Sequence, residues 1–236
     1  MGFTIGSIRE IRYSRPSTRR RARASECVTA AAAYTERYGW AVAPGARAGR
    51  GGGSDRRECS CGAPDCPAPG AHPLPFAGEV PAGATPEQVM AAWEEVPGAT
   101  VLLPAGRAFD VIEVAERSGR RALARLERMG LRLGPVIATP TGRAQFFVAP
   151  GAAAELPDLL YRMGWDDAEL DLHCLGPGDH ITAPPSDLGG LGPVRWLRAP
   201  ECDAARRPPK ARLLLGTLAY VCHRDRTTGP WLALTP

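Results

Sequence analysis

The spacing of apolar and polar positions predicts short helices and strands in alternation. Residues 85–94 open with Thr-Pro-Glu, a helix-start signal with proline at the first helical position, and continue with an apolar face. The strongest helix prediction is residues 120–130, because Leu123, Leu126 and Met129 share one side and a glycine ends the pattern. Further helices are expected at residues 26–37 with Ser25 as the N-cap, near residues 156–165, and at residues 210–224.

Shorter apolar runs have the length of strands. Residues 134–150 are expected to form two strands joined by a Pro-Thr-Gly turn, and residues 169–185 another strand, turn and strand. Helices and strands thus alternate irregularly, and two strand pairs resemble hairpins. This pattern favours an α+β domain around a mixed β-sheet over a regular parallel α/β fold. Single strands are expected at residues 40–44, 100–104, 108–114 and 193–198.

The composition is that of a globular chain. Hydrophobic residues make up 44% and charged residues 23% of the 236 positions. No apolar run approaches the roughly 18 residues of a membrane span, and residues 1–23 carry charge in every turn, unlike a secretory signal. We therefore expect a cytoplasmic protein with no membrane partner. The lesser alternative is membrane-surface binding through a basic amphipathic stretch at residues 3–11.

Positive charge is concentrated at the start of the chain. Residues 1–58 hold twelve arginines against five acidic residues, whereas the remainder holds 17 basic and 20 acidic residues. Within the arm of residues 1–24, clustered arginines offer the planar donors that suit phosphate groups. Two interpretations of this arm stand: a partly disordered, solvated tail, or a contact with nucleic acid.

Three cysteines and a histidine lie in a segment with almost nothing apolar to bury. Cys59, Cys61, Cys66 and His72 fall within residues 45–82, where glycine and proline set tight turns. Without a secretory signal, clustered cysteines more often bind metal than form disulfides. The Cys-x-Cys-x4-Cys-x5-His array supplies all four ligands of tetrahedral zinc, so we expect a structural Zn²⁺ in a zinc knuckle. The alternative is an unstructured loop of free cysteines.

The expected domain division follows these segments. The arm is followed by a domain of residues 25–200 that includes the knuckle, and then by a C-terminal segment of residues 201–236 with a helix. The sequence contains no Gly-x-x-x-x-Gly-Lys-Ser/Thr phosphate loop, which argues against a built-in ATPase motor.

Several segments occur together in a recognisable order: AAAYTERYGWAVAP, CSCGAPDCPAPGAHP, TPTGRAQFFV and ITAPPSDLGG. They resemble the bifunctional DNA primase/polymerase N-terminal family, the prim-pol branch of the archaeo-eukaryotic primase superfamily. The third segment is similar to the family's Thr-Pro-Ser-Gly-Gly-x-His strand pair, and the second to its Cys/His segment, with Ala71 where lysine is usual. The resemblance covers about residues 27–198 and implies an RRM-like core that carries out template-directed nucleotidyl transfer.

The resemblance also implies where catalytic carboxylates would lie. The family holds two Mg²⁺ or Mn²⁺ ions with an Asp-x-Asp pair on a strand and a later Asp. Glu113 matches the first of these positions, Ala115 the second and Asp171 the third. Asp110 is a poor substitute, because side chains alternate along a strand and it points away from the face of Glu113. We expect a degenerate site with Glu113 and Asp171 as its catalytic residues.

Three residues are candidate nucleotide contacts. Gln145 stands at the family's motif histidine, a triphosphate contact, Arg143 lies beside the turn, and Ser186 lies in the Ala-Pro-Pro-Ser stretch. Each has a simpler interpretation. Arg143 is also explained as a surface charge and Ser186 as a turn-fixing hydroxyl, while Glu113 would suit a helix cap and Asp171 a solvent-facing strand position.

Three functions remain open from the sequence. The first is a DNA primase/polymerase domain that binds DNA and nucleoside triphosphates in replication or repair, with its activity retained, weak or lost. The second is a non-catalytic, zinc-stabilised module that binds nucleic acid or nucleotide. The third is a regulatory protein whose arm and C-terminal segment bind other proteins, such as a replication protein.

Overall fold

A computed structural model gives the fold, and it describes the backbone of residues 18–50 and 57–227 and the side chains of residues 22–49 and 58–227. The helices within these ranges are α1 (Thr18–Glu36), α2 (Pro86–Glu94), α3 (Glu116–Arg128), α4 (Ala152–Arg162), α5 (Cys202–Arg206) and α6 (Arg212–Thr227). Every strand pairing described is antiparallel. The α+β class expected from the sequence is confirmed, and the sheet expected to be mixed is antiparallel.

The strands form three sheets. The largest has the order β10-β6-β7-β5-β8, a second has the order β1-β4-β9, and β2 and β3 form a ribbon of their own. The strands are β1 (Ala43–Gly45), β2 (Ala48–Arg50), β3 (Arg57–Cys59), β4 (Thr100–Pro104), β5 (Asp110–Ala115), β6 (Val136–Ala138), β7 (Arg143–Val148), β8 (Leu172–Leu175), β9 (His180–Thr182) and β10 (Arg195–Arg198).

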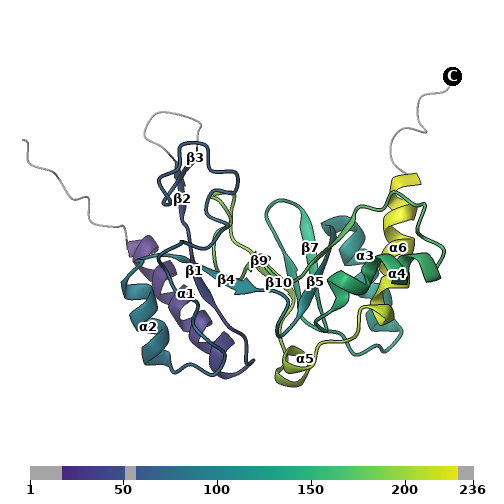
Figure 1. The fold of residues 1–236 in the computed structure, drawn as a ribbon, viewed down its shortest axis with the longest axis horizontal. Helices are drawn as coiled ribbons and strands as arrows, with labels where there is room; N and C mark the ends of the chain where they lie inside the picture. The colour runs from purple at the N-terminus through teal and green to yellow at the C-terminus, as the bar shows by residue number, and fades with distance from the viewer. Residues whose placement is uncertain (1–17, 51–56, 228–236) are drawn as a thin grey trace, which may run out of the picture.

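One face of the five-stranded sheet is covered by helices α3, α4 and α6 (Figure 1). Side chains alternate along each strand, so Ile112 and Val114 of β5 and Phe146 of β7 point toward these helices. They pack with Leu126 of α3 and Leu218 of α6 in a buried core. This core holds α3 and α6 against the sheet and against each other.

The other face of the same sheet meets a second core. Val111 and Phe147 pack there with Val101 of β4 and with Trp40, which follows α1. The rings of Trp40 and Phe147 have centroids 5.3 Å apart, and Phe109 lies 4.4 Å from Phe147. This aromatic core joins the five-stranded sheet to the three-stranded sheet and to α1 (Figure 1).

Close contact between α3 and β7 depends on a glycine. A β-carbon added to Gly119 would lie 2.4 Å from the β-carbon of Ala144, closer than real β-carbons come. Glycine therefore lets α3 rest directly on the strand that carries Arg143 and Gln145. The start of α2 is as predicted, since Thr85 caps it and exchanges hydrogen bonds with Gln88.

Two sequence expectations need correction. Helix α1 begins at Thr18, so Ser25 lies inside it and is not its N-cap; the Arg- and Ala-rich residues before Ser25 are good helix formers. Residues 1–17 of the predicted arm lie outside the described residues. The strands in residues 169–185 do not form a hairpin, because β8 pairs with β5 and β9 with β4. Leu175 and Ile181 both pack on the core between the sheets, so the turn carries the chain across from one sheet to the other.

The C-terminal segment contains α5 and α6, and α6 buries Leu214, Leu215 and Leu218. Among the described residues, no helix combines the length and the apolar character needed to cross a membrane.

Candidate functional site

A cluster of polar side chains occupies one end of the sheet face that carries the aromatic core. On β5, Val111 packs in this core, and Glu113 follows on the same face two residues later. On β7, Phe147 packs in the core and Gln145 follows on that face. Glu113 lies opposite Gln145 in the antiparallel pairing, so the polar cluster begins where the apolar core ends.

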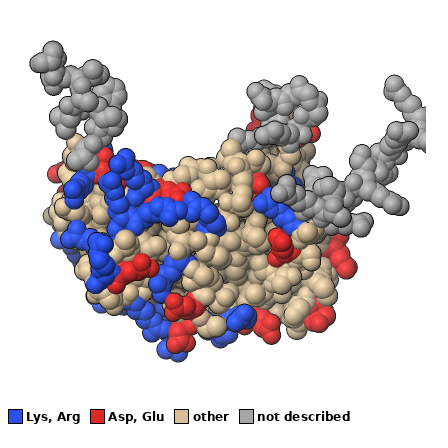
Figure 2. Space-filling view, turned by 180° about the vertical axis from the view of Figure 1, so that it is seen from behind, with Lys and Arg blue, Asp and Glu red and all other residues tan. Residues whose placement is uncertain are grey.

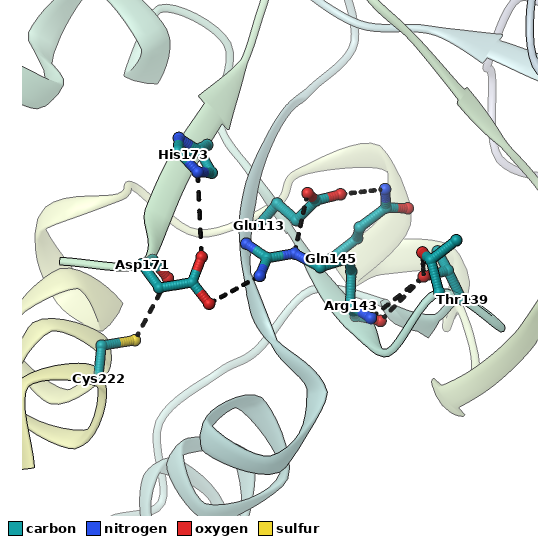
Figure 3. Close-up of polar contacts among 8 residues, drawn as sticks. Glu113, Thr139, Arg143, Gln145, Asp171, His173 and Cys222 are labelled. Atoms are coloured by element: carbon teal, nitrogen blue, oxygen red, sulfur yellow. Dashed lines mark hydrogen bonds and ion pairs between the residues drawn. The ribbon is translucent and has the colours of Figure 1, made fainter. Parts of the chain in front are cut away.

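The next pair along the same face is Ala115 and Arg143, which lie opposite each other. On the other side of β5, Glu113 pairs with His173 of β8, and Asp171 comes directly before that strand. Asp171 and His173 therefore share the face of Glu113, and Figure 3 shows Asp171 between the guanidinium of Arg143 and the ring of His173.

Arg143 joins the two candidate catalytic carboxylates. Its Nε donates to Glu113 Oε1 at 3.1 Å, and its Nη1 donates to Asp171 Oδ2 at 2.7 Å. Figure 3 shows the guanidinium between the two acids. The hydrogen bond from Arg143 lowers the pKa of Asp171, and the same bond raises the pKa of Arg143. Asp171 is thereby held ionised by an internal cation.

Gln145 completes the hydrogen bonding of Glu113. Its Nε2 donates to Glu113 Oε2 at 2.8 Å, so both oxygens of this carboxylate accept protein donors. Two buried polar atoms of the cluster, Arg143 Nη2 and Gln145 Oε1, have no partner among the described residues. Cys222 Sγ lies 3.8 Å from the backbone oxygen of Asp171, and burial raises its pKa to about 11, which keeps the thiol neutral.

The turn before β7 positions Arg143. Thr139 Oγ1 lies 2.7 Å from Thr141 Oγ1 and accepts a hydrogen bond from the backbone N–H of Arg143 at 3.2 Å. Gly142 has φ of 78°, which a residue with a side chain rarely adopts. This is the Pro-Thr-Gly turn expected from the sequence, and it fixes where the arginine leaves the backbone.

One further acid and one serine considered in the sequence can now be placed. Asp110 is on the helix-covered side of β5, where its Oδ2 accepts from the backbone N–H of Ala153 at the start of α4, 2.9 Å away. It is fully buried and does not join the cluster. Ser186 is also buried; its Oγ accepts from the backbone N–H of Val101 at 2.8 Å and lies 3.8 Å from Cys27 Sγ. The structure brings Glu113, Asp171, Arg143 and Gln145 together, but Ser186 makes its contacts elsewhere.

The donor set of this cluster does not fit a pair of divalent ions. Two-metal transfer needs carboxylate oxygens to hold ions about 3.5–4 Å apart. Glu113 and Asp171 provide carboxylates, but the guanidinium of Arg143 bonds to an oxygen of each. Ala115 has no ligand atom to add. A bound Mg²⁺ or Mn²⁺ would have to displace the arginine and tolerate its charge nearby.

The predicted zinc ligands, by contrast, come together. The ligand atoms of Cys59, Cys61, Cys66 and His72 all lie within 4.8 Å of one another. His72 Nε2 is 3.4 Å from Cys59 Sγ and 3.3 Å from Cys66 Sγ. A tetrahedral zinc bound to sulfur and nitrogen would place those atoms about 3.5 Å apart, so the group fits such an ion.

Contacts around the cysteine cluster hold it in shape. His72 Nδ1 lies 2.8 Å from the backbone oxygen of Pro73. This contact orients the ring so that Nε2 points toward the cysteine sulfur atoms. Burial opposes ionisation of Cys59, yet hydrogen bonds from the backbone of Cys61 and Gly70 and from His72 lower its pKa to about 6. The backbone N–H of Ala46 donates to His72 O at 2.9 Å, which ties the cluster to the end of β1. This group can hold a metal ion such as zinc.

Comparisons with known proteins identify the family. A sequence model described as "Bifunctional DNA primase/polymerase, N-terminal" (Prim-Pol) matches residues 31–211. The chain belongs to the Prim-Pol family. No curated protein matches this Prim-Pol chain. A solved structure, the polymerase domain from Mycobacterium tuberculosis Ligase D in complex with DNA, matches with 15% identity and a TM-score of 0.39, over 90% of this chain and 93% of that one. That likeness is too distant to assign a function.

Some residues of the polar cluster differ from the motif that the segment resembles. Compared with the Thr-Pro-Ser-Gly-Gly-x-His motif that the segment resembles, this chain has Arg143 in place of the second glycine and Gln145 in place of the histidine. Sequence reasoning treated Arg143 as a possible phosphate contact and missed that it bridges Glu113 and Asp171. The signal available in the sequence was a pair of departures from the pattern that the resemblance implies, an alanine at position 115 and a base at position 143. That the two lie opposite each other is known only from the structure.

Proposed function

We propose that this Prim-Pol domain is a non-catalytic, zinc-stabilised module that binds nucleic acid in the cytoplasm. Its polar cluster no longer holds the two divalent ions of nucleotidyl transfer. The observation that carries the proposal is the single guanidinium of Arg143 bonded to both Glu113 and Asp171.

Charge is the first supporting argument. Glu113, Asp171 and Arg143 together carry a formal charge of −1, because one base cancels one of the two acids. Two divalent ions bring a charge of +4 and need several anionic ligands close by. The arginine also repels a cation, and its side chain is only 22% exposed, so solvent screens that repulsion less than at the surface.

The missing groups are the second argument. Ala115 lies on the face of Glu113, where a carboxylate would be needed as the second member of the Asp-x-Asp pair. Gln145 can hydrogen-bond to phosphate but cannot carry positive charge, and its Nε2 is already bonded to Glu113. The chain therefore lacks one of the three acids and the histidine of the family's pattern.

Primer extension tests the proposal directly. The zinc-loaded full chain is incubated with a primed DNA template, labelled nucleotide and Mn²⁺, beside its Asp171→Ala variant. We expect no incorporation above the level of the variant. Manganese-dependent extension by the full chain that Asp171→Ala abolishes would overturn the proposal, since it would require the ions to bind beside Arg143.

Metal binding gives an independent measurement. Arg143→Gly removes the bridging cation, so Mn²⁺ should bind this variant about tenfold or more tightly than the unchanged protein, as measured by water-proton relaxation. Arg195→Gly is the matched control, because Arg195 pairs with Glu116 and, within the described part of the chain, has no hydrogen bond or ion pair to the cluster. Equal Mn²⁺ affinity in all three proteins would count against the role assigned to Arg143.

A further inference from the structure

A basic groove runs between α3 and α6 on the outer side of the helix layer. Its volume is about 480 Å³, and its polar lining consists of Arg121, Arg125, Arg128, Tyr220, Arg224 and Asp225. Helices α3 and α6 pack on the opposite face of the sheet from Glu113 and Arg143, so the groove is separate from the polar cluster. Figure 2 shows basic side chains gathered on the α3–α6 side of the molecule.

The groove has a strong excess of positive charge. Four arginines line it against one acid, Asp225. That acid is occupied within the protein, because its carboxylate accepts from Ser118 Oγ at 2.7 Å and pairs with Arg121. Arg125 and Arg128 take part in no ion pair among the residues whose side chains the structure describes. Two guanidinium groups thus face the groove without a protein carboxylate.

The arginines form a row along one wall. Arg121, Arg125 and Arg128 are spaced four and three residues apart on α3, so they lie on one face of the helix. They span about 10.5 Å along the helix axis, close to the rise of about three nucleotides in one strand of DNA. Arg224 of α6 lies on the opposite wall.

Tyr220 adds a surface for stacking. Tyr220 is 43% exposed, and the guanidinium carbon of Arg125 lies 5.3 Å from the centroid of its ring. Arginine over an aromatic ring is oriented by cation–π attraction, which preorganises its donors. An exposed ring beside a row of cations is the arrangement that holds a base while the backbone is neutralised.

We propose that the groove between α3 and α6 binds the sugar–phosphate backbone of a nucleic acid strand. A linear polyanion matches a row of guanidinium groups, each of which offers a planar pair of donors to a phosphate. A flat membrane surface would reach the rim of the hollow but not its lining. This inference deepens the proposed function by naming a surface for nucleic acid, and it stands even if the polar cluster proves catalytic.

Fluorescence anisotropy with a labelled single-stranded oligonucleotide tests the groove in the full chain. The test variant is Arg125→Gln with Arg128→Gln, which avoids the Arg121–Asp225 pair. Each lost phosphate contact on a single strand removes about 0.7 from the slope of log K against log salt, so the slope should fall in magnitude by about 1.4. At about 0.1 M salt the loss of these two phosphate contacts weakens binding of the oligonucleotide roughly 25-fold.

A charge-matched variant provides the control. Arg107→Gln with Arg132→Gln removes the same charge from exposed positions outside the groove, and its salt slope should equal that of the unchanged protein. Equal loss of affinity in both double variants would overturn the proposal, since it would report net charge alone. Binding to vesicles of anionic phospholipid without binding to DNA or RNA would overturn it as well. Equal loss in both double variants would overturn the groove alone, whereas the absence of all binding to DNA and RNA would overturn the nucleic-acid part of the proposed function as well. Neither result depends on metal binding or primer extension, which test the loss of catalysis separately.

Discussion

Ala115 and Arg143 lie opposite each other across the β5–β7 pairing, and the arginine bonds to Glu113, two residues earlier on β5, and to Asp171, directly before β8. In the pattern that the resemblance implies, a carboxylate stands at the position of Ala115 and a glycine at the position of Arg143. The two departures from the family's pattern are therefore neighbours in space. Around these positions the protein has an ion-pair network in which Arg143 joins Glu113 and Asp171.

Reversing these changes should reopen the site to metal. We expect the triple variant Ala115→Asp, Arg143→Gly, Gln145→His to bind Mn²⁺ and to show manganese-dependent primer extension, because it regains an acid and the motif histidine while it loses the cation. Extension on a DNA template and Mn²⁺ relaxation are the two measurements. A folded triple variant that binds Mn²⁺ no better than the unchanged protein would show that the three positions do not explain the missing site.

The Asp171–Arg143 pair predicts a pH-dependent stability. Arg143 lowers the pKa of Asp171 below its ordinary value of 3.8, so the pair stabilises the fold above that pH and the effect is lost as pH falls through the lower folded pKa. Because the Asp171 side chain is 52% exposed, Asp171→Asn should cost only about 0.5 kcal/mol near neutral pH and nothing in strong acid. Urea unfolding at both pH values measures this.

A second aspartate serves as the control for that measurement. Asp203 has a side chain 94% exposed and lies 3.7 Å from Arg132, so Asp203→Asn should leave the unfolding free energy unchanged at either pH. A cost for Asp171→Asn that persists at low pH would assign the effect to packing and not to the ion pair.

Metal removal should loosen the cysteine cluster without unfolding either core. We expect one zinc ion per chain by atomic absorption, and we expect Cys61→Ser to lose it and to expose residues 57–75 to protease. Cys202→Ser, at an exposed cysteine outside the cluster, should retain both the metal and the protease pattern. Equal protease resistance in a metal-free protein would remove the role given to zinc.

A pair of glycine substitutions tests the packing of the helix layer. Gly119→Ala would force a β-carbon against Ala144 and should cost about 1–3 kcal/mol of unfolding free energy. Gly216 lies in α6, where an added β-carbon would meet only Met163 Sδ at 4.0 Å. Gly216→Ala should therefore stabilise the protein by about 0.5–1 kcal/mol, because alanine favours the helix. Opposite signs in chemical denaturation are the expected result.

Local features of this chain could be read from its sequence. The Thr85 cap, the turn before Arg143 and the spacing of Cys59, Cys61 and Cys66 depend on neighbours along the chain, and each lies as expected. Ser25 was assigned as a cap because its side chain suits one, but the helix-forming residues before it extend α1 to Thr18.

Non-local pairings could not be read in the same way. The bridge made by Arg143 depends on the register of β5 with β7 and on the pairing of β8 with β5, which places Asp171 beside β5. Neither pairing follows from the residues next to Arg143 in the sequence. The split of β8 and β9 between two sheets depends on their pairing with β5 and β4, which lie far away in the sequence. Burial of Ser186 likewise depends on Val101, which is far away in the sequence.

The three-stranded sheet draws its strands from widely separated parts of the chain: Ala43–Gly45, Thr100–Pro104 and His180–Thr182. During translation the first two strands cannot complete this sheet until the third has been synthesised. The helix layer cannot form until α6 has left the ribosome. Such late closure makes folding slow and leaves apolar strands uncovered on the nascent polypeptide. We therefore expect this protein to depend on chaperones during synthesis more than its modest size suggests.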